Sequence, residues 1–226
     1  TSQRVDLPDR VFATKQEKLA YITQRTQASV GEGIPILDVS PTVEENKQLA
    51  ASLAASGTGL QVLDAQDVKT NTPEENAAIS QAGKSGAATA ATPMAGRGVD
   101  IKPDAINYKN MAIACDEARL RGQTVLALVE TNEQAQRLQW WFGEGGDIPH
   151  TQWAPDAPLT EGSINIGVLP KADWATQSAP CQLTGADFPG KVLRVVGNGR
   201  SIDPRIDEQL KGRAARQGAP GETEFV

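Results

Sequence analysis

Apolar residues in the first hundred positions switch between two spacings. Leu19, Ile22 and Ala28 recur at helical spacing, whereas residues 34–39 form a short, nearly continuous apolar run. This alternation predicts helices and strands in turn. The predicted helices run from 14 to 31, from 42 to 57 and over 74–81, and the predicted strands cover 34–39, 60–63 and 87–91. Strands separated by helices of this length are typical of βαβ units and a mostly parallel sheet.

The two longer helices each begin with a capping box. Thr14 precedes Glu17, and Thr42 precedes Glu45, by three residues. At this spacing the hydroxyl and the carboxylate reciprocally satisfy free backbone groups. Both starts are therefore predicted from local sequence alone.

Residues 102–190 predict an α/β insert. Its expected elements are a helix from Pro103 to Leu120, a strand over 124–129, a helix over 131–142 and a strand over 163–169. Residues 122–138 repeat the pattern of residues 33–49: a Gly, an apolar run, a Thr cap, a Glu and a final Leu. Either the insert holds a degenerate second copy of this strand–helix unit, or any capped unit of this kind gives the same pattern.

The ends of the chain complete the prediction. Residues 1–13 are polar and predict a linker with a short extended piece, whereas a strand over 191–197, a helix over 204–215 and a final strand beginning at 222 follow the insert. The predicted organisation is one α/β domain over 14–101 and 191–226, interrupted by the insert over 102–190. The chain begins at Thr1 without an initiator Met, which we interpret as a sign of a longer parent protein.

All four tryptophans lie in the insert, at positions 140, 141, 153 and 174. Clustered aromatic side chains either pack a small satellite core or form a binding face. We expect the satellite core.

Composition limits the function classes. The net charge of −6 argues against a dedicated nucleic-acid binder, although a local basic groove is compatible with it. His150 is the only histidine, and Cys115 and Cys181 have no metal-like spacing, so we expect neither a metal site nor a disulfide framework. The sequence has no signal-peptide pattern and no apolar run of transmembrane length.

Two arginines near the end of the chain are the main candidates for chemistry. Arg213 and Arg216 are three residues apart on a predicted helix, among small residues that leave room for a phosphate. Arginine binds phosphate in a bidentate manner and stays charged. Gly83-Lys84-Ser85 imitates the end of a phosphate-binding P-loop, but position 78 is Ala and the triplet precedes a strand, so we expect a turn there.

Three blocks of the sequence resemble a known family. The run R-I-D-E-Q-L-K-G-R-A-A-R-Q-G-A-P-G over Arg205–Gly221 is similar to the last helicase motif of SecA, the preprotein-translocase ATPase. The run A-T-P-M-A-G-R-G-V-D-I over Ala91–Ile101 resembles a second SecA motif, and Asp6–Lys18 more weakly resembles the start of SecA's second nucleotide-binding domain. The blocks keep the family's order and leave the middle of the chain uncovered.

The resemblance implies a RecA-like α/β fold with a mostly parallel sheet and helices on both faces. It implies the second of two lobes that bind ATP between them, with Mg²⁺ held mainly by the first lobe. Arg213 and Arg216 would be arginine fingers facing the γ-phosphate. The other residues implied for the nucleotide site are Gly96, Arg97, Gly98, Asp100 and Gln209.

The family also implies partners and a location. These are the first lobe of the same longer chain, the Sec channel and a preprotein, with nucleic acid unlikely on charge, in the cytoplasm or at the membrane surface. We expect this chain to be inactive alone. Pro93 and Val99 depart from the polar residues of the family motif. Two alternatives therefore stay open: a nucleic-acid helicase lobe, and a divergent SecA-like scaffold domain without ATPase activity.

Overall fold

The computed structural model describes residues 3–63, 73–93, 100–144, 147–190, 192–214 and 220–226. The chain divides into two compact units. Unit 1 contains Thr1–Asp104 and Gly190–Val226, and unit 2 contains Ala105–Pro189. Each unit has its own parallel sheet and its own buried apolar clusters.

Unit 1 is built on a six-stranded sheet with the order β1-β10-β9-β2-β4-β3, in which every pair is parallel. Its strands are β1 (Gln3–Asp6), β2 (Ile36–Val39), β3 (Gln61–Leu63), β4 (Ala88–Ala91), β9 (Leu193–Gly197) and β10 (Pro220–Phe225). The connections from β2 and from β9 lead in opposite directions across the sheet. The order of the strands therefore reverses between β2 and β9.

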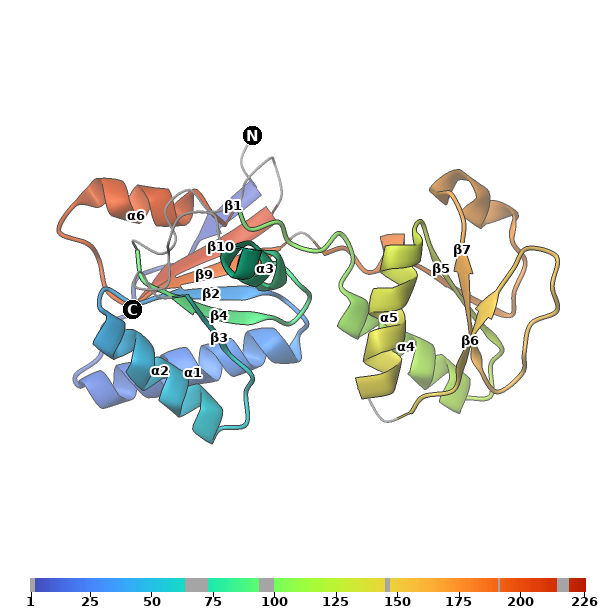
Figure 1. Ribbon diagram of the computed structural model, residues 1–226, viewed down its shortest axis with the longest axis horizontal. Coiled ribbons are helices and arrows are strands. Elements are labelled where there is room, and N and C mark those ends of the chain that lie inside the picture. Colours follow the sequence, from blue (N-terminus) through green and yellow to red (C-terminus); the bar gives the residue numbers. More distant parts are fainter. Residues whose placement is uncertain (1–2, 64–72, 94–99, 145–146, 191, 215–219) are drawn as a thin grey trace. The chain divides into compact units, whose positions relative to one another are not determined.

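Helices cover both faces of this sheet (Figure 1). Helices α1 (Lys15–Gly31) and α2 (Val43–Ala55) lie on one face, and helices α3 (Pro73–Ala82) and α6 (Pro204–Lys211) lie on the other. Successive residues of a strand point to opposite faces of the sheet: Ile36 packs with α1 and α2, whereas Leu37 packs with α3 and α6. The predicted α/β fold with a parallel sheet and helices on both faces is confirmed.

The predicted helix caps are present in unit 1. The Thr14 hydroxyl accepts from the Glu17 N–H while the Glu17 carboxylate accepts from the Thr14 N–H. The Thr42 hydroxyl accepts from the Glu45 N–H at 3.2 Å. Residues 83–85 form the expected turn before β4 rather than a P-loop.

Unit 2 has a four-stranded parallel sheet with the order β6-β7-β5-β8. Its strands are β5 (Val125–Val129), β6 (His150–Trp153), β7 (Ile164–Val168) and β8 (Cys181–Thr184). Helices α4 (Tyr108–Leu120) and α5 (Asn132–Glu144) pack on one face, and the short 3-10 helices η1 (Lys171–Thr176) and η2 (Gly185–Asp187) complete the unit.

Two of the tryptophans fill the second face of the unit 2 sheet. Trp174 is 6% exposed and packs on Leu126 and Leu128, with Trp153 at the margin of the same cluster. The Trp174 Nε1–H donates to the Leu169 carbonyl at 3.0 Å. Trp141 packs at the edge of the larger core, whereas Trp140 is 55% exposed. The satellite core is therefore present, and Trp140 lies outside it.

The two ends of unit 2 lie side by side. Ile106 and Pro189 form an antiparallel bridge, and the Asn107 N–H donates to the Phe188 carbonyl at 2.9 Å. Unit 2 is consequently closed by its own first and last residues.

The predicted boundaries were wrong in four places. Residues 3–6 lie where a linker with a short extended piece was expected, but they form a strand of the sheet, β1, because β10 supplies a parallel partner at the sheet edge. Helix α4 begins at Tyr108 rather than Pro103, since Asn107 supplies the cap by accepting from the Asn110 N–H. Helix α6 ends at Lys211 rather than 215. Strands β6 and β8 were not predicted, because they are edge strands of four residues with at most two apolar residues each, too few for a clear strand pattern.

The resemblance between residues 33–49 and 122–138 extends to topology. The strand order β9-β2-β4-β3 in unit 1 matches β8-β5-β7-β6 in unit 2, element by element along the chain. The caps match as well, because the Thr131 hydroxyl accepts from the Gln134 N–H as Thr42 does from Glu45. A common origin of the two units stays a hypothesis.

Candidate functional site

Two of the sequence blocks predicted to form the site meet on one face of the unit 1 sheet. Ile101, at the end of the first block, and Ala214, in the second, are 5% and 2% exposed and belong to the same apolar cluster under α3 and α6. Asp100 and Arg213 are the chain neighbours of these two residues. The fold places these segments together although more than a hundred residues separate them in the chain.

Arg213 lies just beyond the end of α6. Its N–H donates to the Leu210 carbonyl at 3.1 Å, which continues the helix by one turn. The residue is 8% exposed and interacts with a partner inside the chain. A guanidinium group can be buried only when its charge is compensated. To bind a phosphate, Arg213 would therefore exchange an internal contact for the ligand.

The backbone after α6 is held by a close approach to β10. A Cβ built on Gly221 would overlap the carbonyl group of Ala214. Only glycine lets the two backbone segments come this near. The glycine that ends the R-x-x-R-Q-G-A-P-G run therefore sets the position of residues 213 and 214.

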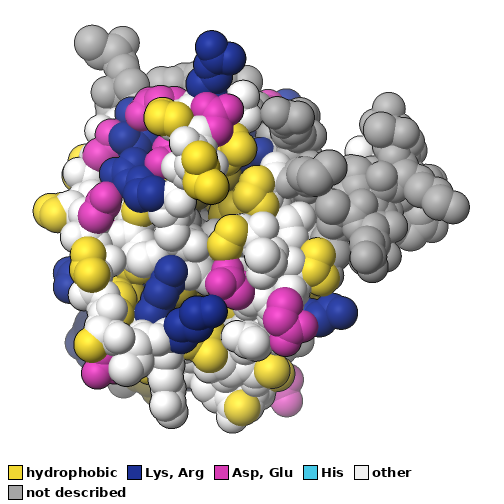
Figure 2. Space-filling view, turned by 90° about the vertical axis from the view of Figure 1, so that its left-hand side faces the viewer, with side chains coloured by type: hydrophobic (Ala, Val, Ile, Leu, Met, Phe, Trp, Pro, Cys, Tyr) yellow, Lys and Arg dark blue, Asp and Glu magenta, His cyan; other side chains and the backbone are white. Residues whose placement is uncertain are grey.

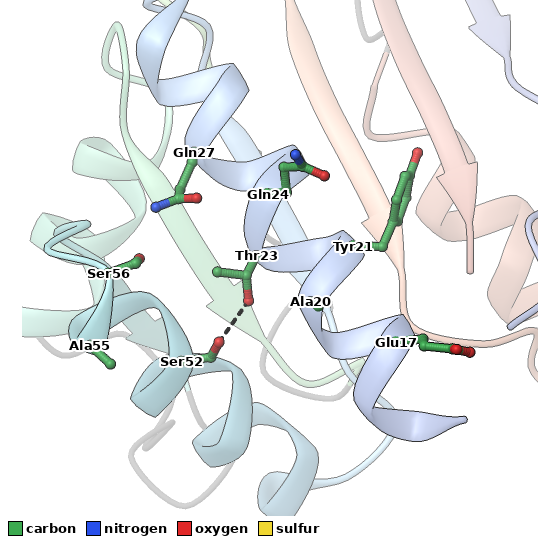
Figure 3. A pocket seen from close by; sticks show the side chains of 9 residues that line it. All are labelled: Glu17, Ala20, Tyr21, Thr23, Gln24, Gln27, Ser52, Ala55 and Ser56. Atoms are coloured by element: carbon green, nitrogen blue, oxygen red, sulfur yellow. Dashed lines mark hydrogen bonds between the residues drawn. The ribbon is translucent and has the colours of Figure 1, made fainter. Parts of the chain in front are cut away.

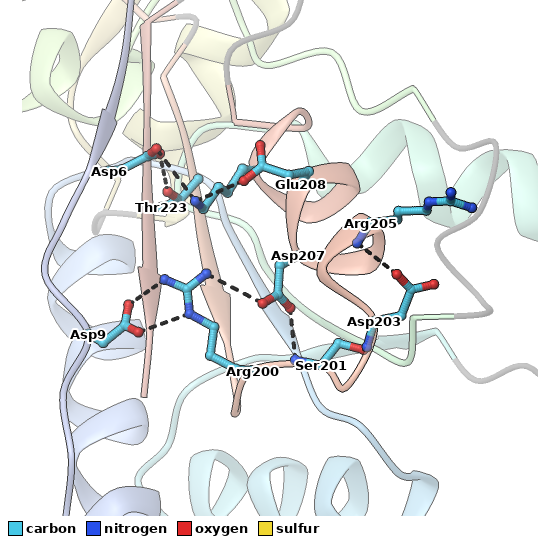
Figure 4. Close-up of polar contacts among 10 residues, drawn as sticks. Asp6, Asp9, Arg200, Ser201, Asp203, Arg205, Asp207, Glu208 and Thr223 are labelled. Atoms are coloured by element: carbon cyan, nitrogen blue, oxygen red, sulfur yellow. Dashed lines mark hydrogen bonds and ion pairs between the residues drawn. The ribbon is translucent and has the colours of Figure 1, made fainter.

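The first turn of α6 is held by a network of ions centred on Arg200 (Figure 4). The Arg200 Nε and Nη2 donate to the Asp9 carboxylate at 2.9 and 2.7 Å, and Nη1 donates to Asp207 Oδ2 at 3.4 Å. The other Asp207 oxygen accepts from the Ser201 N–H at 2.8 Å. The guanidinium carbon lies 4.0 Å above the centre of the Phe225 ring. Arg200 thus joins the segment after β1, helix α6 and the end of β10.

A second contact joins β1 to the same helix. The Thr223 hydroxyl donates to Asp6 Oδ1 at 2.6 Å, and the Lys211 Nζ lies 3.9 Å from Asp6 Oδ2. Lys211 also pairs with Glu208 at 3.1 Å. The last turn of α6 is therefore tied to the sheet edge as well.

These contacts change the acidity of the groups involved. The hydrogen bonds from Arg200 lower the pKa of Asp9, and the hydrogen bond to Asp9 raises the pKa of Arg200. Burial raises the pKa of Asp6, but hydrogen bonds from Thr223 and Arg4 outweigh it, so that this pKa is lowered overall. Asp6, Asp9 and Arg200 therefore stay ionised at neutral pH.

The predicted site residues fall into two groups. Gly96, Arg97, Gly98 and Arg216 lie outside the described residues. Among the others, Arg213 is buried, Asp100 is partly buried and Gln209 is exposed on α6. No role was predicted for Arg200 or Asp9, because nothing in the local pattern shows that residues so far apart form an ion pair.

A further cation lies at the carboxyl edge of the sheet. A Cβ built on Gly199, directly after β9, would be 3.8 Å from the Lys18 Nζ. Burial lowers the pKa of Lys18.

Figure 2 views unit 1 from the side on which the chain ends in Figure 1, and basic, acidic and apolar side chains are interspersed on it.

A hollow of about 780 Å³ lies between α1 and α2 (Figure 3). Among the residues that the structure describes, those lining the hollow include no basic side chain and no predicted site residue, and the Thr23 and Ser52 hydroxyls are hydrogen-bonded to each other at 2.9 Å. Its lining residues are Glu17, Ala20, Tyr21, Thr23, Gln24, Gln27, Ser52, Ala55 and Ser56. An anionic nucleotide would find no compensating charge there.

One buried carboxyl group lies outside the predicted site. Asp38, on the central strand β2, is 1% exposed and accepts from the Thr26 hydroxyl at 2.8 Å. Burial raises the pKa of Asp38 to about 7, with the Thr26 hydrogen bond opposing this effect. Its protonation is therefore linked to the stability of unit 1.

Within the described parts of the chain, no group of three or more His, Cys, Asp or Glu side chains is arranged to hold a metal ion. No helix among the same residues has the length and apolar character needed to cross a membrane.

Comparisons with known proteins cover the whole chain. A family model described as the SecA P-loop domain matches residues 1–226, including the insert that the three sequence blocks leave uncovered. A protein translocase subunit SecA from Chloroflexus aggregans is 32% identical over 226 residues, which are 98% of this chain and 18% of the relative. The SecA subunit of Leptospira biflexa is 30% identical over 229 residues, covering 99% of this chain and 23% of the relative.

Among solved structures, a hypothetical ATP-dependent RNA helicase from Sulfolobus tokodaii matches with a TM-score of 0.28 and 16% identity, over 100% of this chain and 87% of its own. That likeness supports no functional statement. The chain spans about a fifth of the length of the curated relatives it matches. Because the family model covers the complete sequence, the chain belongs to the SecA P-loop domain family.

Proposed function

We propose that this chain is the second nucleotide-binding lobe of a SecA-like, ATP-driven protein translocation motor. Its role is to supply Arg213 and Arg216 to ATP bound against a first lobe that this chain does not contain. The observation that carries the proposal is the meeting of the 100–101 and 213–214 segments in one apolar cluster. These are the two blocks whose side chains the family resemblance assigns to the nucleotide.

The choice of the second lobe rests on the residues present. The sequence has no G-x-x-x-x-G-K-[ST] run, which would supply the phosphate cradle and the Mg²⁺-binding hydroxyl. It has instead the paired arginines that stabilise charge on a transferring phosphoryl group. Arg213 would contact one side of the bound triphosphate. Gln209 would help to hold the helix that carries the arginines. The other residues proposed for the nucleotide site are Gly96, Arg97, Gly98 and Asp100.

Bound ATP would supply the γ-phosphoryl group, and Mg²⁺ held mainly by the first lobe would neutralise its charge. The contribution of this chain is positive charge at a fixed place. An arginine finger of this kind is worth about 10³–10⁵ in kcat in related phosphoryl transfers. Once Arg213 has exchanged its internal contact for the ligand, the Gly221–Ala214 contact keeps its backbone in place as charge develops.

Exposed apolar side chains at the carboxyl edge agree with a covering partner. Val11 follows β1 and is 94% exposed, and Ile202 follows β9 and is fully exposed. We assign this edge to contacts with the first lobe of the longer chain. By analogy with the relatives, which are named protein translocase subunits, the whole protein would act in the cytoplasm or at the membrane surface on a Sec channel and a preprotein.

Steady-state ATP hydrolysis by the full-length parent protein tests the proposal. Arg216→Ala and Arg213→Ala should each lower kcat by at least about 100-fold, with Arg121→Ala in unit 2 as the matched control. Equal turnover in all variants would refute the arginine-finger role. A parent protein that binds no nucleotide would favour a scaffold domain instead.

A further inference from the structure

Helix α6 carries Arg213 only if the helix itself is held in place. It has eight residues, and isolated helices of that length are not stable in water. Apolar contacts through Ile206 and Leu210 hold its inner face on the sheet. These contacts are non-directional, so they permit sliding along the sheet more readily than charged hydrogen bonds do.

The first turn of α6 has directional contacts with Ser201 and Asp203, which are its near neighbours in the chain, and its contact with the segment after β1 passes through Arg200. Arg200 makes two hydrogen bonds to Asp9, at 2.9 and 2.7 Å, and one to Asp207 at 3.4 Å. Asp207 is 6% exposed and lies on α6, whereas Asp9 lies in the leading segment, residues 7–13, which follows β1. Two parallel N–H···O bonds to one carboxylate fix orientation as well as distance.

Phe225 and Gly197 determine the position of the Arg200 side chain. The carbon of its guanidinium group lies 4.0 Å from the centre of the Phe225 ring, and the Phe225 ring in turn lies over Gly197. A Cβ on Gly197 would be 2.6 Å from the ring, so only glycine leaves space for this stack. Gly197, Phe225 and Arg200 are thus stacked on one another, and this stack supports the side chain that pairs with Asp9 and Asp207.

The leading segment is itself fastened to β10. The Leu7 N–H donates to the Thr223 carbonyl at 2.8 Å, and the Arg10 N–H donates to the Phe225 carbonyl at 2.9 Å. Asp9 is therefore a fixed point. Through Arg200, the chain that leads into unit 1 is connected to the helix that bears the proposed arginine finger.

We propose that Arg200 is a positioning residue for Arg213. By pairing with Asp9 and with Asp207, it links the leading segment to α6 and so fixes the position of Arg213. The Asp9–Arg200–Asp207 clasp holds the first turn of the helix, and the Gly221–Ala214 contact holds its end. A displacement of the leading segment is then transmitted to Arg213 through α6. This inference rests on the proposed function, since it assigns Arg213 a place in the nucleotide site.

The first test is a double-mutant cycle in the full-length parent protein. Arg200→Lys keeps the positive charge but loses the bidentate geometry. It should lower kcat for ATP by about 10-fold with KM changed less than about threefold, because a misplaced finger affects charge stabilisation in the transition state. In the Arg213→Ala background the same substitution should lower kcat less than about twofold. An equal loss in both backgrounds, or no loss in either, would overturn the clasp.

The second test does not depend on turnover. Amide hydrogen exchange of the full-length protein should show faster exchange in both residues 7–13 and residues 204–211 in Arg200→Lys, and in Asp9→Asn, but not in Arg121→Lys. Unchanged exchange in these two segments would overturn the clasp. If the parent hydrolyses no ATP, or if Arg213→Ala has no effect on turnover, the proposed function is refuted. The hydrogen-exchange result then tests by itself whether the Asp9–Arg200–Asp207 clasp links the leading segment to α6.

Discussion

Gly221 and Ala214 lie so close that a Cβ on Gly221 would overlap the Ala214 carbonyl group. This approach joins the start of β10 to the residues after α6, where Arg213 lies. A glycine in a phosphate-binding motif is often ascribed to the ligand. Here its place is explained by packing between two segments of the same chain.

Gly221→Ala should therefore destabilise unit 1 by about 2–4 kcal/mol, because one of two backbone segments must move. Urea unfolding followed by far-UV circular dichroism measures the change. Gly59→Ala is the matched control: a Cβ there meets nothing within 4 Å, and we expect a change within about 0.5 kcal/mol. Equal effects of the two substitutions would contradict the close approach.

Asp38 should make stability depend on pH. Its pKa is raised from 3.8 to about 7 in the folded protein, so the folded state binds a proton that the unfolded state releases. The contribution of Asp38 to stability is then largest below about pH 4, falls as pH rises to about 7 and is level above that. Asp38→Asn should remove this slope and be more stable than the wild type at pH 8 by about 1–3 kcal/mol.

The comparison of wild type and Asp38→Asn at each pH cancels the titration of other groups. Asp156→Asn, in an exposed turn, serves as the control and should leave the slope unchanged. A slope that survives in Asp38→Asn would show that another group causes it.

Unit 2 should be removable. Its two ends are bridged at Ile106 and Pro189, and each unit has its own parallel sheet and its own apolar clusters. Replacing residues 105–189 by a short Gly/Ser linker should leave a cooperatively unfolding α/β domain, measurable by calorimetry. Loss of the unfolding transition would mean that unit 1 depends on unit 2.

The tryptophans of unit 2 should differ in their contribution to stability. Trp174→Ala should cost about 3–5 kcal/mol, since it empties the small core and leaves the Leu169 carbonyl without its donor. Trp140→Ala, on an exposed side chain, should cost less than about 1 kcal/mol. Denaturant unfolding of the two variants measures both, and similar costs would contradict the assignment of the core.

The sequence by itself determined the elements whose signals are local. The caps at Thr14 and Thr42, the apolar run before Thr42 and the turn at Gly83 involve residues a few positions apart, so the pattern could be interpreted without a fold. The SecA-like blocks also lie in continuous stretches. They indicated the family and named the arginines, although they did not show how the arginines are held.

Only the tertiary structure decided what depends on residues far apart in the chain. Strand β1 exists because β10 pairs with it, and the role of Arg200 depends on Asp9, which lies near the opposite end of the chain. The burial of Arg213 and the need for glycine at position 221 likewise arise from packing. Hydrogen bonds and close contacts between distant segments are selected by the whole fold, and a local pattern carries no trace of them.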